Sequence, residues 1–127
     1  MEVIQGLKYS ENHHWVRVEG KRAVIGMTDF AQEEFGMVMF AELPEIGDSL
    51  LAGEPFGSME SVKTVTELYA PVSGTVVDIN AKLQKEPNLI NMSPYGQGWL
   101  LVIEMSDPAE LESLWDADRY KETYIHE

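Results

Sequence analysis

The sequence predicts a mainly β fold whose strands pair antiparallel, with one short internal helix and helices at the C-terminus. Short runs rich in β-branched and aromatic residues are separated by turns that carry glycine, proline or asparagine. These runs do not alternate with long helical patterns, as they would in a parallel α/β fold. The clearest start signal for a helix follows the last strand-like run, near the C-terminus.

Length and composition indicate a single domain spanning residues 1–127. Domains most often contain about 100–150 residues, enough to form one core. A content of 44% hydrophobic and 24% charged residues is typical of a folded chain and not of a disordered one. We therefore expect one core and no second domain. We also expect a monomer.

The charge balance restricts the classes of partner. Nine Lys and Arg against 22 Asp and Glu leave a formal net charge of −13. Such a surface repels nucleic-acid phosphates and anionic membranes, and it favours proteins that present basic patches. We expect binding to neither nucleic acid nor membrane.

Motifs for catalysis, metal binding and export are missing from the sequence. It has no cysteine, so a disulfide, a thiolate metal site and a thiol nucleophile are excluded. We find no glycine-rich phosphate loop, Gly-x-Ser-x-Gly or His-Glu-x-x-His, and thus expect no catalysis. The N-terminus lacks a basic, then apolar leader, and the apolar runs at 37–41 and 99–103 are far shorter than a membrane span of about 20 residues. We expect a soluble, cytoplasmic protein.

The N-terminal third predicts a hairpin. Alternating residues 15–18 and the apolar run 23–26 flank a Gly-bearing turn at 19–22. His13 and His14 are adjacent, so in extended chain they point to opposite faces and we expect no shared metal.

A short helix is predicted to follow this hairpin, over residues 28–36. Thr28 can cap the start, and Gly36 is positioned to end the helix. The apolar run 37–41 then predicts a buried strand, with Met37 and Met39 as core filler.

The middle of the chain predicts a second hairpin with Lys63 at its tip. Residues 56–62 and 64–69 are dense in β-branched side chains and form its two arms. Residues 70–74 supply another turn, where we expect Gly74 to permit the reversal, and 75–79 form the next strand.

The C-terminal part predicts an irregular loop, a strand and two helices. Residues 86–98 are punctuated by Pro, Gly and Asn, and 99–105 form the last strand. Asp107 can cap a helix that Pro108 begins and Glu110 completes as a capping box, with an apolar face at 111, 114 and 115. A second short helix is predicted from Asp118.

Lys63 is the only basic residue between Arg22 and Lys82, a stretch that carries ten acidic residues. One interpretation is an ordinary solvated turn lysine, because charged residues are mostly exposed. The other is a lysine retained for its amine, as a site of acylation that turns a charge into a neutral amide. Composition alone leaves both open.

Residues 60–63, Glu-Ser-Val-Lys, followed by 69–74, Tyr-Ala-Pro-Val-Ser-Gly, resemble the lipoyl-lysine hairpin of the glycine cleavage system H protein family. The resemblance extends over nearly the whole chain: residues 7–9, 13, 15–16, 26–32, 42–44, 91, 93–95 and 98–99. It implies a lipoyl-domain-like fold, a flattened β-barrel or sandwich of two antiparallel sheets closed by C-terminal helices.

The resemblance implies lipoic acid attached by an amide to Lys63, with Glu60 and Gly74 as recognition features for lipoylation. It implies a non-catalytic carrier that takes an aminomethyl group from the pyridoxal-phosphate glycine decarboxylase to the tetrahydrofolate-dependent aminomethyltransferase. Electrons would pass to dihydrolipoamide dehydrogenase. A lipoate ligase or a lipoyl/octanoyl transferase would attach the arm.

Three positions of the family's arm pocket map onto His14, Glu34 and Glu67. His14 stands where the family commonly has a glutamate, and Glu34 stands where some members have a histidine. We expect His14 and Glu34 to face one cleft, and the sequence leaves open whether they compensate for each other. A histidine beside that carboxylate would be more easily protonated.

Three alternatives remain at this stage. Carriers that resemble H protein also serve sulfur oxidation with heterodisulfide-reductase-like complexes, or lipoyl relay. A biotin carrier shares the fold type but prefers Met on both sides of its lysine, whereas Val62 and Thr64 flank Lys63. A β-domain without a prosthetic group would leave the lysine unmodified.

Overall fold

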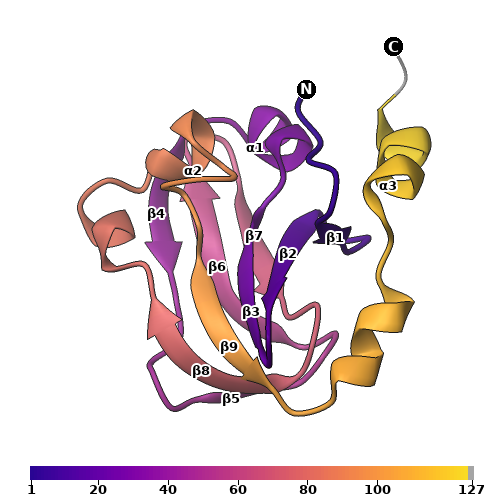
Figure 1. Ribbon diagram of the computed structural model, residues 1–127. Coiled ribbons are helices and arrows are strands. Elements are labelled where there is room, and N and C mark those ends of the chain that lie inside the picture. Colours follow the sequence, from indigo (N-terminus) through magenta and orange to yellow (C-terminus); the bar gives the residue numbers. More distant parts are fainter. Residues whose placement is uncertain (126–127) are drawn as a thin grey trace.

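The computed structural model describes residues 1–125 as two antiparallel sheets with short helices at their ends (Figure 1). The larger sheet has the strand order β1-β2-β3-β9-β8-β5, and its strands are β1 (Lys8–Tyr9), β2 (His14–Glu19), β3 (Arg22–Met27), β9 (Leu101–Met105), β8 (Gly74–Ile79) and β5 (Ser49–Leu50). The smaller sheet has the order β4-β6-β7, formed by β4 (Val38–Glu42), β6 (Pro55–Ser61) and β7 (Val65–Tyr69). The predicted mainly β fold with two antiparallel sheets is confirmed.

The helical elements are short and lie at the connections. They are α1 (Asp29–Phe35), the 3₁₀ turn η1 (Ala81–Gln84), α2 (Leu89–Met92), the 3₁₀ segment η2 (Pro108–Ser113) and α3 (Ala117–Tyr124). None of the helices in residues 1–125 is both long and apolar enough to cross a bilayer.

The hairpin of β2 and β3 is confirmed, with longer strands than predicted. Its register runs from His14 opposite Met27 to Glu19 opposite Arg22, so the turn contains only two residues. Alternate residues of these strands enter different clusters, because successive side chains of a strand point to opposite faces. Val16 and Ile25 join the core cluster that reaches both sheets, whereas Trp15 and Val24 pack with Tyr9 of β1 and Tyr120 of α3.

Helix α1 begins and ends as its sequence predicts. The Thr28 hydroxyl accepts a hydrogen bond from the Ala31 amide at 3.2 Å, which satisfies a free donor of the first turn. Gly36 closes the helix with φ of 89°, a conformation that costs glycine little. This geometry fixes where the chain leaves α1 for β4.

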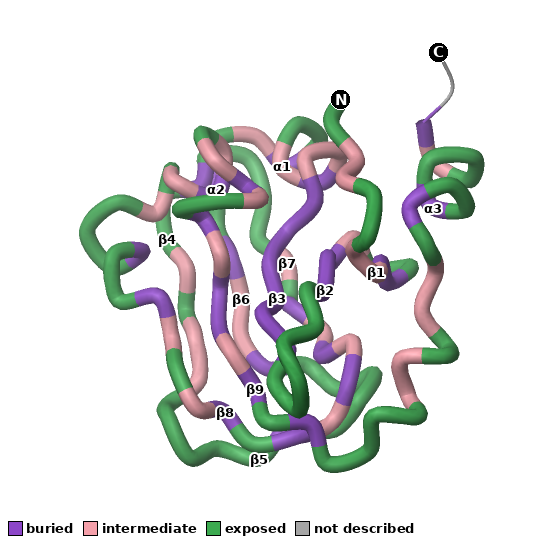
Figure 2. The backbone as a smooth tube through the Cα atoms, viewed as in Figure 1, coloured by how far each residue is buried: buried purple, intermediate pink, exposed green. Residues whose placement is uncertain are grey.

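The prediction of a buried strand at 37–41 is wrong. Strand β4 lies at the edge of the small sheet, and only Val38 among its residues is fully buried (Figure 2). Met37, Met39 and Phe40 are exposed by 51%, 46% and 66%. An apolar run predicts burial only where a second layer covers the strand, and no described residue covers the outer face of β4 fully.

The capping box predicted at Glu110 is also wrong. Asp107 does cap the segment through the Ala109 amide, but the segment is a 3₁₀ helix that ends at Ser113. The Glu110 carboxylate instead accepts hydrogen bonds from the amide and hydroxyl of Ser73, at 2.7 and 3.0 Å. The single helical face predicted at 111, 114 and 115 is therefore wrong, and Trp115 pairs with the backbone of Tyr9.

The last helix is confirmed, beginning one residue earlier than predicted. Asp116 caps α3 through the Arg119 amide at 2.8 Å. Tyr120 of α3 stacks on Tyr9 with ring centroids 4.8 Å apart, which fixes α3 against the edge of the large sheet. Within the predicted irregular loop 86–98, the structure forms the one-turn helix α2.

Candidate functional site

Lys63 lies in the tight turn that joins β6 to β7. The turn is closed by the Ser61 amide, which donates to the Thr64 carbonyl at 2.8 Å, and the strands pair from Glu60 opposite Val65 downward. The predicted position of Lys63 at a hairpin tip is confirmed. Its side chain is exposed, so its amine is accessible to a modifying enzyme.

The Lys63 side chain rests on the C-terminal end of α1. A Cβ built on Gly36 would lie 3.3 Å from Lys63 Cε and 3.7 Å from its Nζ. Because Gly36 has no side chain, the Lys63 side chain can lie across the backbone at this position. Sequence reasoning identified Gly36 as a helix end but missed this contact, because it joins positions 27 residues apart and depends on the β4–β6 pairing.

Asn91 holds this surface in place. Its Oδ1 accepts from the Val38 amide at 2.8 Å, and its Nδ2 donates to the Gly36 carbonyl at 2.9 Å and to Gln32 Oε1 at 3.0 Å. One side chain of α2 therefore satisfies polar groups at the end of α1 and the start of β4.

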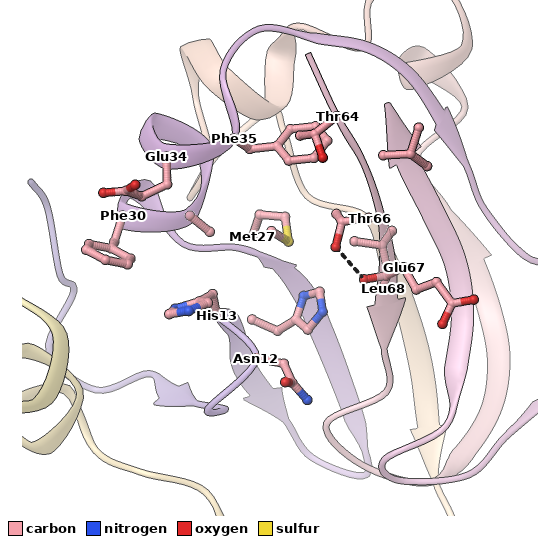
Figure 3. Close-up of a pocket in the computed structure, with 13 residues that line it drawn as sticks. Asn12, His13, Met27, Phe30, Glu34, Phe35, Thr64, Thr66, Glu67 and Leu68 are labelled. Carbon is pink, nitrogen blue, oxygen red and sulfur yellow. Dashed lines mark hydrogen bonds between the residues drawn. The ribbon is translucent and has the colours of Figure 1, made fainter. Parts of the chain in front are cut away.

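A cavity of about 500 Å³ opens beside the Lys63 hairpin (Figure 3). One wall comes from the start of β2 and from α1, the other from β7, and Thr64 and Phe35 lie close together at one end in the view. Its lining residues are Asn12, His13, His14, Met27, Phe30, Ala31, Glu34, Phe35 and residues 64–68. His14 and Glu34 both border it, as expected for one cleft.

His14 is the most buried ionisable group of this wall. Its side chain is 1% exposed, and its ring lies 5.8 Å from that of Phe56. Burial lowers the pKa of His14 to about 4, with a smaller opposing effect from a backbone hydrogen bond at Gly26. Its Nδ1 has no hydrogen-bond partner among the described residues.

Glu34 acts on His13 and not on His14. The carboxylate raises the pKa of His13, but the larger effect of burial leaves that pKa lowered. His13 is fixed by a hydrogen bond between its Nδ1 and the Tyr120 hydroxyl at 2.8 Å. The expectation that the nearby acid would favour protonation of His14 is wrong, because desolvation dominates at that buried position.

Glu67 borders the cavity from β7, but its carboxylate points away from Glu34 (Figure 3). Alternation along β7 directs Thr66 and Leu68 to one face and Glu67 to the other. The Tyr69 hydroxyl donates to the Glu67 carboxylate at 3.1 Å on that outer face.

Glu60 lies in the small sheet and Gly74 in the large one. Glu60 is exposed on β6, between Phe40 of β4 and Val65 of β7. Gly74 is the first residue of β8 and does not form the turn itself, so the predicted reason for this glycine is wrong. A Cβ at Gly74 would overlap the Glu104 carbonyl of β9, and close strand approach explains the residue.

The part of the chain that the structure describes contains no cluster of side chains suited to binding a metal ion. No group of three or more His, Cys, Asp or Glu side chains within residues 1–125 is arranged to hold an ion.

Comparison with known proteins agrees with this geometry. A family model described as glycine cleavage H-protein matches residues 7–127. A glycine cleavage system H protein of Brevibacillus brevis (strain 47) is 58% identical over 121 residues, covering 95% of this chain and 96% of that protein. Its counterpart in Bacillus subtilis (strain 168) is 52% identical over 122 residues, covering 96% of each.

A crystal structure with the same fold is also similar. The glycine cleavage system H protein from Mycobacterium marinum superposes with a TM-score of 0.87 at 33% identity, covering 95% of this chain and 98% of that one. With the family match extending from the first sheet to the C-terminal helix, this chain belongs to the glycine cleavage H-protein family, a family of carrier subunits and not of catalysts.

Proposed function

We propose that this protein carries lipoate as an amide on Lys63 and serves the glycine cleavage system as its mobile carrier. The observation that carries the proposal is the exposed lysine at a tight hairpin turn, beside a cavity, in a chain 58% identical to a named H protein. Within this proposal, residues 1–127 act as one domain, as a monomer, in the cytoplasm.

The residues present fit a lipoyl arm. The cavity of about 500 Å³ lies beside the hairpin that bears the lysine, and it is lined by apolar side chains such as Met27, Phe35 and Leu68. Its wall also holds one buried nitrogen, His14 Nδ1, without a partner among the described residues. Apolar walls with a few polar groups are typical of small-molecule sites.

On the side of this protein, attachment requires only the amine of Lys63. The neutral amine attacks the carbonyl carbon of an activated lipoate, such as an acyl adenylate. A C–N bond forms, the C–O bond to the nucleotide phosphate breaks, the nucleotide monophosphate leaves and the amine gives up a proton to solvent. A lipoate ligase supplies this substrate, whereas a lipoyl/octanoyl transferase supplies the acyl group as a thioester and releases a thiol.

A lipoyl group held by Lys63 would supply the dithiolane that a cysteine-free chain lacks, which is the chemistry needed for a carrier between glycine decarboxylase, aminomethyltransferase and dihydrolipoamide dehydrogenase. The protein's own part is to hold the arm on a narrow turn that enters each partner. Tethering raises the effective concentration of the arm at each site.

His14 is proposed to hold the amine of the carried group. With its pKa lowered by burial, the imidazole stays neutral at pH 7 and keeps a lone pair for a donor N–H. Glu34 borders the same cavity and would add attraction for a cation. A smaller role in holding the carried group is proposed for Glu67, because its carboxylate accepts a hydrogen bond from the Tyr69 hydroxyl on the outer face of β7.

Attachment is tested by intact mass after incubation with purified lipoate–protein ligase, lipoate and ATP. We expect one lipoyl adduct on the wild-type protein and none on Lys63→Ala. No adduct, or an adduct that survives Lys63→Ala, contradicts the site. A biotinyl adduct after incubation with biotin ligase would support the biotin-carrier alternative instead.

The pathway is tested by glycine–bicarbonate exchange with purified glycine decarboxylase, beside a known H protein. We expect the lipoylated protein to support exchange and Lys63→Ala to support none. The named relatives do not favour carriage in sulfur oxidation or lipoyl relay. A fully lipoylated sample without exchange would return those carriers to consideration.

The role of His14 has a readout that is independent of turnover. The ¹⁵N resonance of its Nδ1 should shift by several ppm when the lipoylated protein is loaded with the aminomethyl group, while those of His13 stay unchanged. An unshifted His14 resonance in a loaded sample, verified by mass, excludes the hydrogen bond.

A further inference from the structure

The Tyr120 hydroxyl lies between two segments that form one wall of the cavity bordered by His14. It is 2.8 Å from His13 Nδ1, in the turn before β2, and 2.8 Å from Thr28 Oγ1, at the start of α1. His14 is the residue after His13, and Glu34 belongs to α1. One hydroxyl of the C-terminal helix α3 therefore connects the two segments that carry the polar groups of the cavity.

The directions of these hydrogen bonds follow from burial. Tyr120 and Thr28 are both fully buried, so each hydroxyl proton needs an acceptor inside the protein. The Thr28 oxygen already accepts from the Ala31 amide. Within the hydrogen bonds of residues 1–125, both protons are bonded only if Thr28 donates to Tyr120 and Tyr120 donates to His13 Nδ1. His13 is then the neutral tautomer that carries its proton on Nε2.

His13 also has an unusual backbone conformation. Its φ is 68°, and it is the one residue other than glycine with a positive φ in residues 1–125. That region is disfavoured for residues with a Cβ, and it persists where surrounding contacts hold it. The contacts here are the bond to Tyr120, the Thr28 amide on the His13 carbonyl at 3.0 Å, and the rings of Phe30 and Tyr124. Two of these contacts come from α3, so the helix supports the turn that leads into β2.

A neutral His13 leaves the charge of Glu34 available to a ligand. Figure 3 shows His13 below α1, on the side of the cavity that bears Phe30 and Glu34. The Glu34 carboxylate raises the pKa of His13, but burial has the larger effect and lowers that pKa, so His13 is uncharged at pH 7. The cavity therefore offers a cation the carboxylate of Glu34 and the lone pair of His14 Nδ1.

We propose that Tyr120 is a positioning residue that holds His14 and Glu34 at the separation that the carried amine requires. Tyr120 is not among the residues that line the cavity, and it acts through His13 and Thr28. Without its hydroxyl, the starts of β2 and α1 lose a shared contact, and the turn at His13 loses support for its left-handed backbone. This inference rests on the proposed function of the cavity and adds a residue, distant in sequence, that sets the geometry of the cavity.

The hydroxyl bond is measured first, on the protein without a lipoyl group. Tyr120→Phe removes the hydroxyl and keeps the ring that stacks on Tyr9. At pH 7.5 the ¹⁵N resonance of His13 Nδ1 should move downfield in this variant, because the nitrogen lone pair loses its donor. Tyr124→Phe is the matched control, since the Tyr124 hydroxyl lies on the same helix but donates to the Glu11 carbonyl. This control should leave the His13 resonance in place.

The hold on the carried amine is measured next. The lipoylated protein is reduced and treated with formaldehyde and ammonia, so that one thiol gains an aminomethyl group and water is released. Water reverses this reaction and returns the thiol, ammonia and formaldehyde, and the free formaldehyde reports the rate of loss. We expect Tyr120→Phe to lose the group about fivefold faster than the wild type, the factor that one hydrogen bond of typical strength supports. Tyr124→Phe should match the wild type.

Thr28 supplies a second test that leaves Tyr120 intact. Thr28→Val keeps the shape of the side chain but removes its hydroxyl, whereas Thr28→Ser retains a hydroxyl. The valine variant should show the faster loss, and the serine variant the wild-type rate. On loading, the His14 Nδ1 resonance should also shift less in Thr28→Val and Tyr120→Phe than in the wild type. Lower thermal stability alone does not change that shift in samples kept well below Tm.

The outcomes separate the two proposals. If the wild-type protein gains no lipoyl adduct, the proposed function fails and this inference fails with it. If the wild type is lipoylated and loaded but Tyr120→Phe loses the aminomethyl group no faster than Tyr124→Phe, only this inference is overturned. An unchanged His13 resonance in Tyr120→Phe overturns it as well, and that measurement needs no lipoyl arm.

Discussion

The pH dependence of stability tests the buried state of His14 directly. The pKa of His14 is about 4 in the folded protein, against about 6.5 for an unperturbed histidine. The unfolded chain therefore binds a proton at a pH where the folded protein does not. The stabilisation that arises from a neutral His14 is complete above pH 6.5 and is lost as the pH falls toward 4.

The size of the effect follows from the two pKa values. The full difference corresponds to about 3 kcal/mol, and the part lost between pH 7.5 and pH 5 is about 2 kcal/mol. Other groups also titrate in this range, so the prediction concerns the difference between wild type and His14→Gln. The free energy of unfolding of the wild type minus that of His14→Gln should fall by about 2 kcal/mol as the pH falls from 7.5 to 5.

Urea unfolding at pH 7.5, 6.25 and 5 measures this convergence. His13→Gln serves as a control, because His13 is only partly buried and its pKa is lowered by less than full desolvation would give. A gap between wild type and His14→Gln that stays constant across these pH values would falsify the neutral, buried histidine. An NMR titration midpoint of His14 at pH 6 or above would refute it as well.

Three further changes test contacts that position the site. Gly74→Ala should lower the free energy of unfolding by about 2 kcal/mol and Tm by several degrees, since the added methyl group overlaps the facing carbonyl of β9. A Tm equal to that of the wild type would show that the two strands separate freely. Asn91→Ala should lower the free energy of urea unfolding by about 2–3 kcal/mol, because it leaves buried partners of the Asn91 amide unpaired, including the Val38 amide. Asn91→Asp should restore part of this stability. A loss below about 0.5 kcal/mol in Asn91→Ala would contradict this account. Glu110→Ala should cost about 1–2 kcal/mol by removing both bonds to Ser73, with Glu112→Ala as the exposed control; equal stability of the two variants would exclude a role for this contact.

Local sequence determined much of the architecture. Thr28 and Gly36 delimit α1 through a hydroxyl cap and a left-handed closing residue, both of which act within one helical turn. The Lys63 turn likewise follows from β-branched arms that meet at a short reversal. Such features depend on neighbours in the chain, so they can be predicted before the fold is known.

The sequence pattern was insufficient where burial depends on the layer opposite. The apolar residues 37–41 have the pattern of a buried strand, yet β4 is an edge strand whose outer face is exposed. Glu110 has the spacing of a capping box, but Ser73, far away in sequence, offers a better pair of donors. Periodicity reports which residues are apolar and does not report what covers them.

The sequence by itself determined the family, the mainly β fold and the place of Lys63 in a hairpin turn, because these follow from residue identity and local spacing. Only the tertiary structure decided the ionisation of His14, the contact of Lys63 with Gly36, and the bonds of Tyr120 to His13 and Thr28. Each of these depends on desolvation or on packing between distant segments. Such quantities exist only once the chain has excluded water and set its register.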